Sequence, residues 1–144
     1  MTLHLIKLCV GVDTFDELRT WQQKRLRQMR KAGEPAELKH TTRMMPKRRD
    51  ELLAGGSLYW VIKGLVQARQ TLTDIRPFTD SEGISRCHLM LGDKLVPVAP
   101  RPFRAFQGWR YYQAKDAPPD LATGDEINEM PEEMRRELAE LGLL

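Results

Sequence analysis

At 144 residues, with 41% hydrophobic and 30% charged residues, the chain has the size and composition of one soluble domain with its own core. No apolar run approaches the roughly 20 residues that span a bilayer, and the start MTLHLIKLCVGVD lacks a basic leader and a cleavage site. Only Cys9 and Cys87 are present, which excludes a disulfide framework. We therefore expect a cytoplasmic protein with reduced thiols.

The net charge of +3 hides a strong asymmetry along the chain. Residues 19–49 carry eleven Lys and Arg against two Glu, giving +9, whereas residues 116–144 carry nine acids and two Arg, giving −7. This pattern predicts binding of a polyanion, an acidic tail that folds over a basic face, or both.

The first third of the chain predicts a strand and an amphipathic helix. Leu3 to Val12 is apolar on both alternating sides, which indicates a central or barrel strand. Thr14 and Glu17 form a capping box for a helix that runs to about Lys31. One arc of this helix is apolar and the opposite face is cationic. The residues on the apolar arc are Phe15, Leu18, Trp21, Leu26 and Met29.

The middle of the chain predicts strands separated by a short helix. Residues 38–44 read as a short strand, and Pro46 suits the first turn of a helix that ends at Gly55–Gly56. Residues 57–63 and 65–75 follow as two strands joined through Gly64. Their alternation places Leu58, Trp60 and Ile62 toward the core and Tyr59 with Lys63 toward a cleft.

The remaining segments predict further strands and a terminal helix. A polar loop at 78–85 precedes a strand at 86–91, and a proline-containing connector or edge strand follows at 95–103. A strand at 106–112 closes the core. We expect an α+β domain over residues 1–117, built on a small curled antiparallel sheet or barrel. Residues 118–144 then form an acidic tail whose helix at 131–141 docks on the domain.

No residues form a recognisable catalytic or metal-binding motif. Cys87 and His88 are adjacent in a strand and point to opposite faces, so they cannot easily act as nucleophile and base. His4, His40 and His88 are too scattered for a metal motif. We expect no cofactor, and an enzyme is the less favoured interpretation.

The chain resembles a small family of unknown function, domain of unknown function 1489, found mainly in alphaproteobacteria. The resemblance is carried by LIKLCVG at 5–11, GGSLYWVIKG at 55–64, Arg69–Gln70 and FQGWRYY at 106–112. The segment ELLAGGSLYWVIKG also looks more loosely like the PUA-like barrels of the ASCH and EVE groups, which implies binding of RNA or a modified base. However, the Gly-x-Lys-x-x-Glu-x-Arg pattern of ASCH proteins is missing after Gly55, so no hydrolytic activity carries over.

The favoured hypothesis is a non-catalytic, PUA-like module that binds RNA, or DNA with a modified base. Basic side chains contact phosphates, and a second group lines an aromatic cleft. The ten site residues predicted are Arg25, Arg27, Arg30, Lys47, Arg48, Arg49, Tyr59, Lys63, Arg69 and Arg110.

Two other classes stay open. One is an enzyme acting on a nucleotide or modified nucleoside, with Asp50, Glu51, Asp74 and His88 as candidate acid–base groups. The other is a protein-interaction module that uses the basic face and the acidic tail. The sequence leaves the oligomeric state open.

Overall fold

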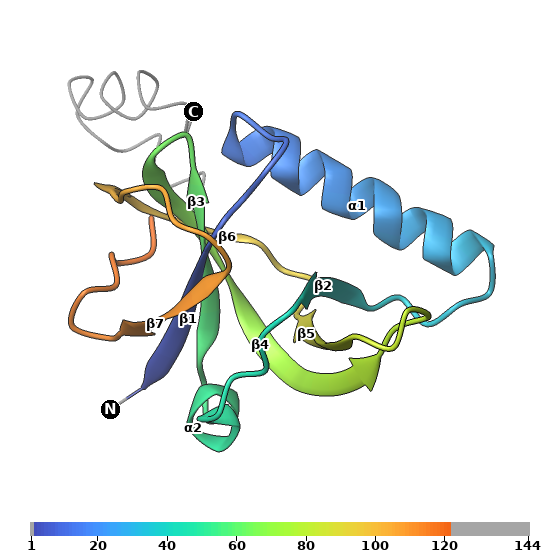
Figure 1. The fold of residues 1–144 in the computed structure, drawn as a ribbon. Coiled ribbons are helices and arrows are strands. Elements are labelled where there is room, and N and C mark those ends of the chain that lie inside the picture. The colour runs from blue at the N-terminus through green and yellow to red at the C-terminus, as the bar shows by residue number, and fades with distance from the viewer. Residues whose placement is uncertain (1, 122–144) are drawn as a thin grey trace.

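The strands of this chain form a curled sheet that is flanked by one long and one short helix (Figure 1). A computed structural model describes residues 2–121. The elements are β1 Leu3–Leu8, α1 Phe15–Lys31, β2 Leu38–Thr42, α2 Arg49–Leu53, β3 Ser57–Ile62, β4 Leu65–Thr79, β5 Ser85–Leu91, β6 Val96–Pro102 and β7 Trp109–Gln113. Within the described residues, neither helix is long and apolar enough to cross a membrane.

The sheet is mixed and open, which corrects the expectation of a purely antiparallel one. Its strand order is β2-β5-β4-β3-β1-β7. The seventh strand, β6, lies outside this order and pairs with β4. The pair β1–β3 is parallel, whereas the other pairs are antiparallel. The parallel pair arises because α1, β2 and α2 intervene between these strands, which allows the chain to cross back.

Strand β4 gives the sheet its curl. Its 15 residues extend beyond the predicted end at Ile75. The first part pairs with β3 and β6, and the second part pairs with β5. Register shifts at Val66/Ala68 and Leu72/Asp74 mark irregularities of the β-bulge type, which bend and twist a strand. One long strand therefore joins two parts of the sheet at an angle (Figure 1).

Helix α1 begins as the sequence predicts, but its buried face differs. The Thr14 hydroxyl accepts from the Glu17 amide at 3.1 Å, which confirms the cap. The buried residues are Phe15, Leu18, Gln22 and Leu26. Trp21, which we expected in this stripe, is 55% exposed. Gln22 takes a core position because its amide has a buried partner on β4.

Helix α2 is shorter than expected and leads through two glycines into β3. It begins at Arg49 and not at Pro46, because the amides of Lys47 and Arg48 donate to the Tyr111 hydroxyl instead. Gly56 lies where a Cβ would be 2.3 Å from two backbone oxygens, those of Leu3 and Leu52. Only glycine fits there, so the helix and β1 pack closely at the entry to β3.

The two faces of β3 enter different cores. Leu58, Trp60 and Ile62 belong to the larger cluster, as the alternation predicts. Tyr59 and Val61 belong to a smaller cluster on the other face. Tyr59 is therefore 5% exposed and does not open onto a cleft, because Tyr112 of β7 and the partly buried Phe103 pack in the same cluster.

Strand β6 and residues 118–121 extend the sheet. β6 pairs with β4 despite its prolines, in agreement with the expected edge strand. Residues 118–121 run along β6, where the Ala99 amide donates to the Pro119 carbonyl and the Leu121 amide donates to the Pro97 carbonyl, both at 2.8 Å. The predicted helix at 131–141 lies outside the described residues.

Candidate functional site

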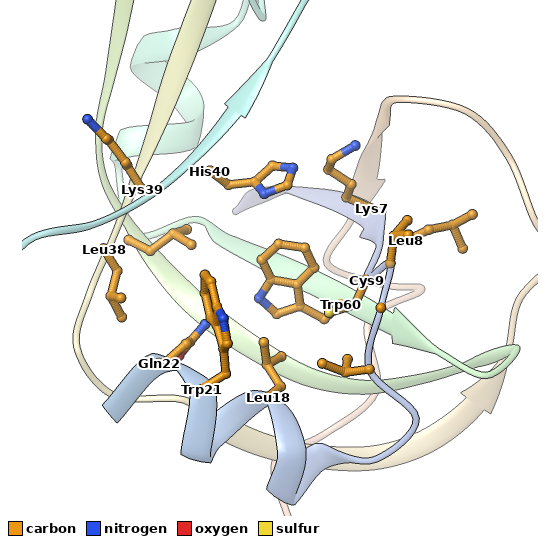
Figure 2. Close-up of a pocket in the computed structure, with 14 residues that line it drawn as sticks. Lys7, Leu8, Cys9, Leu18, Trp21, Gln22, Leu38, Lys39, His40 and Trp60 are labelled. Carbon is orange, nitrogen blue, oxygen red and sulfur yellow. The ribbon is translucent and has the colours of Figure 1, made fainter. Parts of the chain in front are cut away.

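A pocket of about 380 Å³ lies between α1 and the sheet, as Figure 2 shows. The end of β1 and the loop after it form one wall, and α1 contributes Leu18, Trp21 and Gln22. β2 contributes Leu38, Lys39 and His40. Trp60 from β3 lies between these walls (Figure 2). The volume falls within the range of small-molecule sites, roughly 300–1,000 Å³.

A buried amide network fixes the ring of Trp60. Its Nε1 donates to Oε1 of Gln70 at 2.9 Å, and the same oxygen accepts from Nε2 of Gln22 at 2.8 Å. Gln70 Nε2 donates back to Gln22 Oε1 and to the Gly92 carbonyl. Gln70 is fully buried and Trp60 is 4% exposed. The indole therefore forms a rigid part of the pocket wall.

His40 and Lys7 lie beside each other at the pocket, on the side of Trp60 that is away from α1 (Figure 2). The imidazole of His40 meets the Trp60 ring edge to face, with 5.2 Å between centroids. Burial, to which the charge of Lys7 adds, lowers the pKa of His40 to about 4. Burial also lowers the pKa of Lys7. At neutral pH the imidazole is uncharged, so it presents one N–H donor and one ring nitrogen acceptor.

The thiol in this pocket is unreactive at neutral pH. Burial raises the pKa of Cys9 to about 11, so the nucleophilic thiolate is scarce. The arrangement is therefore suited to binding and not to thiolate catalysis. Lys7 directs its charge toward the pocket, which favours an anionic ligand, whereas the ammonium of Lys39 points away from it (Figure 2).

The outer face of α1 is basic, as the sequence predicts. Arg25, Arg27 and Arg30 are all exposed. Arg25 lies over the exposed Trp21 ring, with its guanidinium carbon 5.9 Å from the centroid. Since Trp21 lines the pocket, the basic face of α1 continues to the pocket rim.

The structure does not join the second predicted basic group to the first. Lys47, Arg48 and Arg49 lie at the start of α2, which Figure 1 shows at a different end of the sheet from α1. Arg48 forms an ion pair with Glu51. Arg49 donates to Asp74 at 2.5 Å and to the Ile75 carbonyl at 2.9 Å. These contacts hold α2 against β4.

The four residues that we expected to line a cleft do not form one together. Tyr59 is buried. Arg69 binds both carboxylate oxygens of Asp120 at 2.6 Å. Lys63 lies in the turn between β3 and β4, and Arg110 lies over the Phe106 ring at 4.8 Å. The alternation correctly separated the two faces of β3, but Trp60 and not Tyr59 reaches the pocket.

The candidate acid–base groups of the enzyme hypothesis have structural partners. Asp74 pairs with Arg49 and Arg76. His88 stacks on Phe78, with centroids 4.0 Å apart, and its Nδ1 is 3.1 Å from the Thr41 hydroxyl. Within residues 2–121, no group of three or more His, Cys, Asp or Glu is placed to hold a metal ion.

The sequence-based prediction missed the residues of the pocket. Lys7 is a lone charge within the apolar strand LHLIKLCV, and Trp21 lies beside Arg25 on a cationic helix. Lys7 was visible as an irregularity in its pattern, whereas Trp21 fitted the predicted apolar arc of the helix. His40 had no such signal, because only the fold brings its side chain from β2 against Trp60 and near Lys7.

The comparisons with known proteins identify a family but no activity. No curated protein and no solved structure matches the chain. The family model described as protein of unknown function (DUF1489) matches residues 5–144. The chain belongs to this family.

Proposed function

We propose that this protein binds nucleic acid, with RNA as the favoured class, through the basic face of α1 and the adjoining rim of the pocket. The observation that carries the proposal is the set of exposed arginines on α1, Arg25, Arg27 and Arg30, of which Arg25 lies over the Trp21 ring at the pocket rim. No ion pair within residues 2–121 neutralises these arginines. Exposed cations beside an exposed indole suit phosphates that alternate with bases.

A PUA-like architecture remains part of the proposal. The curled sheet and the entry of α2 through Gly55–Gly56 into the buried strand β3 support it. The parallel pair β1–β3 is also consistent with a strongly bent sheet. The open edge means that such a likeness concerns the strand arrangement and not a closed barrel.

Fluorescence anisotropy with short single-stranded RNA and DNA at several salt concentrations tests the proposal. We expect log Kd to rise linearly with the logarithm of the salt concentration. Each lost phosphate contact reduces the slope by about 0.7 for a single strand. The triple variant Arg25→Gln/Arg27→Gln/Arg30→Gln should therefore lower the slope by about 2. Absence of binding at low salt would refute the proposal.

Matched variants separate the two basic groups. Arg27→Gln is compared with Lys115→Gln, which removes one exposed positive charge from a turn elsewhere. The pair Lys47→Gln/Arg48→Gln tests whether the start of α2 contributes. Equal losses for Arg27→Gln and Lys115→Gln, with about twice that loss for the double variant, would indicate a response to net charge alone and would contradict a specific role for α1.

A further inference from the structure

We infer that the pocket between α1 and the sheet holds one nucleotide, either free or as an unpaired unit of a strand. This inference rests on the proposed function, but it concerns a different set of side chains. The base would enter between Trp21 and Trp60, and the phosphate would lie near Lys7. The evidence comes from the aromatic walls, the polar rim and the size of the cavity.

The two indoles give the pocket one fixed and one exposed aromatic wall. Trp60 is held by its hydrogen bond to the fully buried Gln70. Trp21 is 55% exposed and lies at the edge of the face of α1 that buries Leu18 and Gln22. A large apolar ring that is left exposed beside a cavity gains burial when a flat ring enters. Stacking on an aromatic side chain contributes roughly 1–3 kcal/mol per base.

The polar groups at the rim match the remaining parts of a nucleotide. Neutral His40 offers a donor and an acceptor, as the edge of a base requires. Lys7 forms no ion pair within the described residues, so its charge is available to a phosphate. The only hydrogen bond of Lys7 there is a long one of 3.4 Å to the Gly108 carbonyl.

The shape of the pocket selects an unpaired base. Its walls come from a helix and a sheet, and its interior is lined by Leu18, Leu38 and Leu91. A base within a duplex has both faces stacked and its pairing edge occupied, so it cannot enter. A purely apolar ligand would cover the Lys7 ammonium and His40 without offering a polar partner to either. A flat ring that carries a phosphate satisfies both parts of the site.

Tryptophan fluorescence and calorimetry with the four common ribonucleoside 5′-monophosphates test the inference on the full chain. We expect saturable quenching, because Trp21 and Trp60 both line the site. Trp21→Ala should weaken binding roughly 5- to 150-fold, the equivalent of one stacking contact. Gln28→Ala, an exposed position on the same helix, is the matched control and should bind normally.

A comparison of a nucleotide with its nucleoside tests whether Lys7 binds the phosphate. Adenosine 5′-monophosphate should bind more tightly than adenosine, and Lys7→Met should remove this difference. Lys115→Met, a surface control, should retain it. Equal affinities of the wild-type protein for nucleoside and nucleotide would overturn the assignment of Lys7 to a phosphate.

The same variants distinguish this inference from the proposed function. One outcome is that oligonucleotides bind, mononucleotides do not, and Trp21→Ala leaves the oligonucleotide affinity unchanged. The pocket assignment then fails, while the role of the basic face of α1 stands. If mononucleotides bind with dependence on Trp21 but oligonucleotides do not bind, the proposed function fails and the pocket is a site for free nucleotides.

Discussion

Gln22 on α1 and Gln70 on β4 form a reciprocal pair of amide hydrogen bonds of 2.8 and 2.9 Å inside the core. This pair ties the helix to the sheet and also orients the indole of Trp60. A buried polar network of this kind specifies one arrangement of its elements, because each amide left without its partner loses free energy. The position of the pocket therefore depends on two glutamines that do not themselves carry charge.

Replacing Gln22 by leucine should lower the free energy of unfolding by about 1–3 kcal/mol, since Gln70 then loses two hydrogen bonds in a buried site. Gln23→Leu, at the next and exposed position, should change it by less than about 0.5 kcal/mol. Urea unfolding of both variants provides the measurement. Similar values for the two variants would show that the amide pair does not stabilise the core.

Gly56→Ala should destabilise the fold by about 3 kcal/mol or more, because the added Cβ would meet two backbone oxygens at 2.3 Å. Neither backbone segment can move without disturbing α2 or β1. Gly33→Ala is the control, since Gly33 has a φ of 74° but open space around it. Its cost should be about 1–2 kcal/mol, the cost of a left-handed backbone alone. Thermal unfolding would contradict this account if Gly33→Ala were the more damaging change.

Acid should destabilise the protein partly through His40. The pKa of His40 is about 4 in the folded chain and close to 6.5 when unfolded, so the unfolded state binds the proton first as pH falls. The stability that the neutral His40 imidazole contributes to the folded state is complete above about pH 6.5 and is lost progressively as the pH falls toward 4. The effect should be on the order of 2–3 kcal/mol.

The variant His40→Gln isolates this contribution. Burial also lowers the pKa values of His4 and His88, but both residues remain in the variant. The difference in unfolding free energy between wild type and variant should therefore change between pH 7 and pH 4.5 by the part due to His40. A difference that does not depend on pH would refute the assignment of a neutral, buried imidazole.

Asp120→Asn should loosen the attachment of residues 118–121 to β6. Both carboxylate oxygens bind Arg69, and these hydrogen bonds lower the pKa of Asp120. The ion pair therefore stabilises the fold above the usual Asp pKa and loses its effect as pH falls through the lowered value. We expect a loss of up to about 1 kcal/mol at pH 7, because the pair is partly exposed. The control is Asp116→Asn, and urea unfolding compares the two at pH 7.

Local patterns in the sequence determined most elements and their approximate ends. Thr14 and Glu17 specify the start of α1 through hydrogen bonds over three residues. The alternation along 57–62 separates Trp60 from Tyr59 because successive strand residues point to opposite faces. Gly64 identifies the turn between β3 and β4, where its φ is 77°. Each of these features depends on neighbours in the sequence.

Only the tertiary structure decided which side chains form the pocket. Lys7, Trp21, His40 and Trp60 come from four elements that are distant in sequence, and the parallel pairing of β1 with β3 helps to bring them together. The burial of Tyr59 likewise depends on β7, and the burial of Gln22 depends on a partner 48 residues away. Such placements follow from long-range packing, because a local pattern defines the faces of an element but not what covers them.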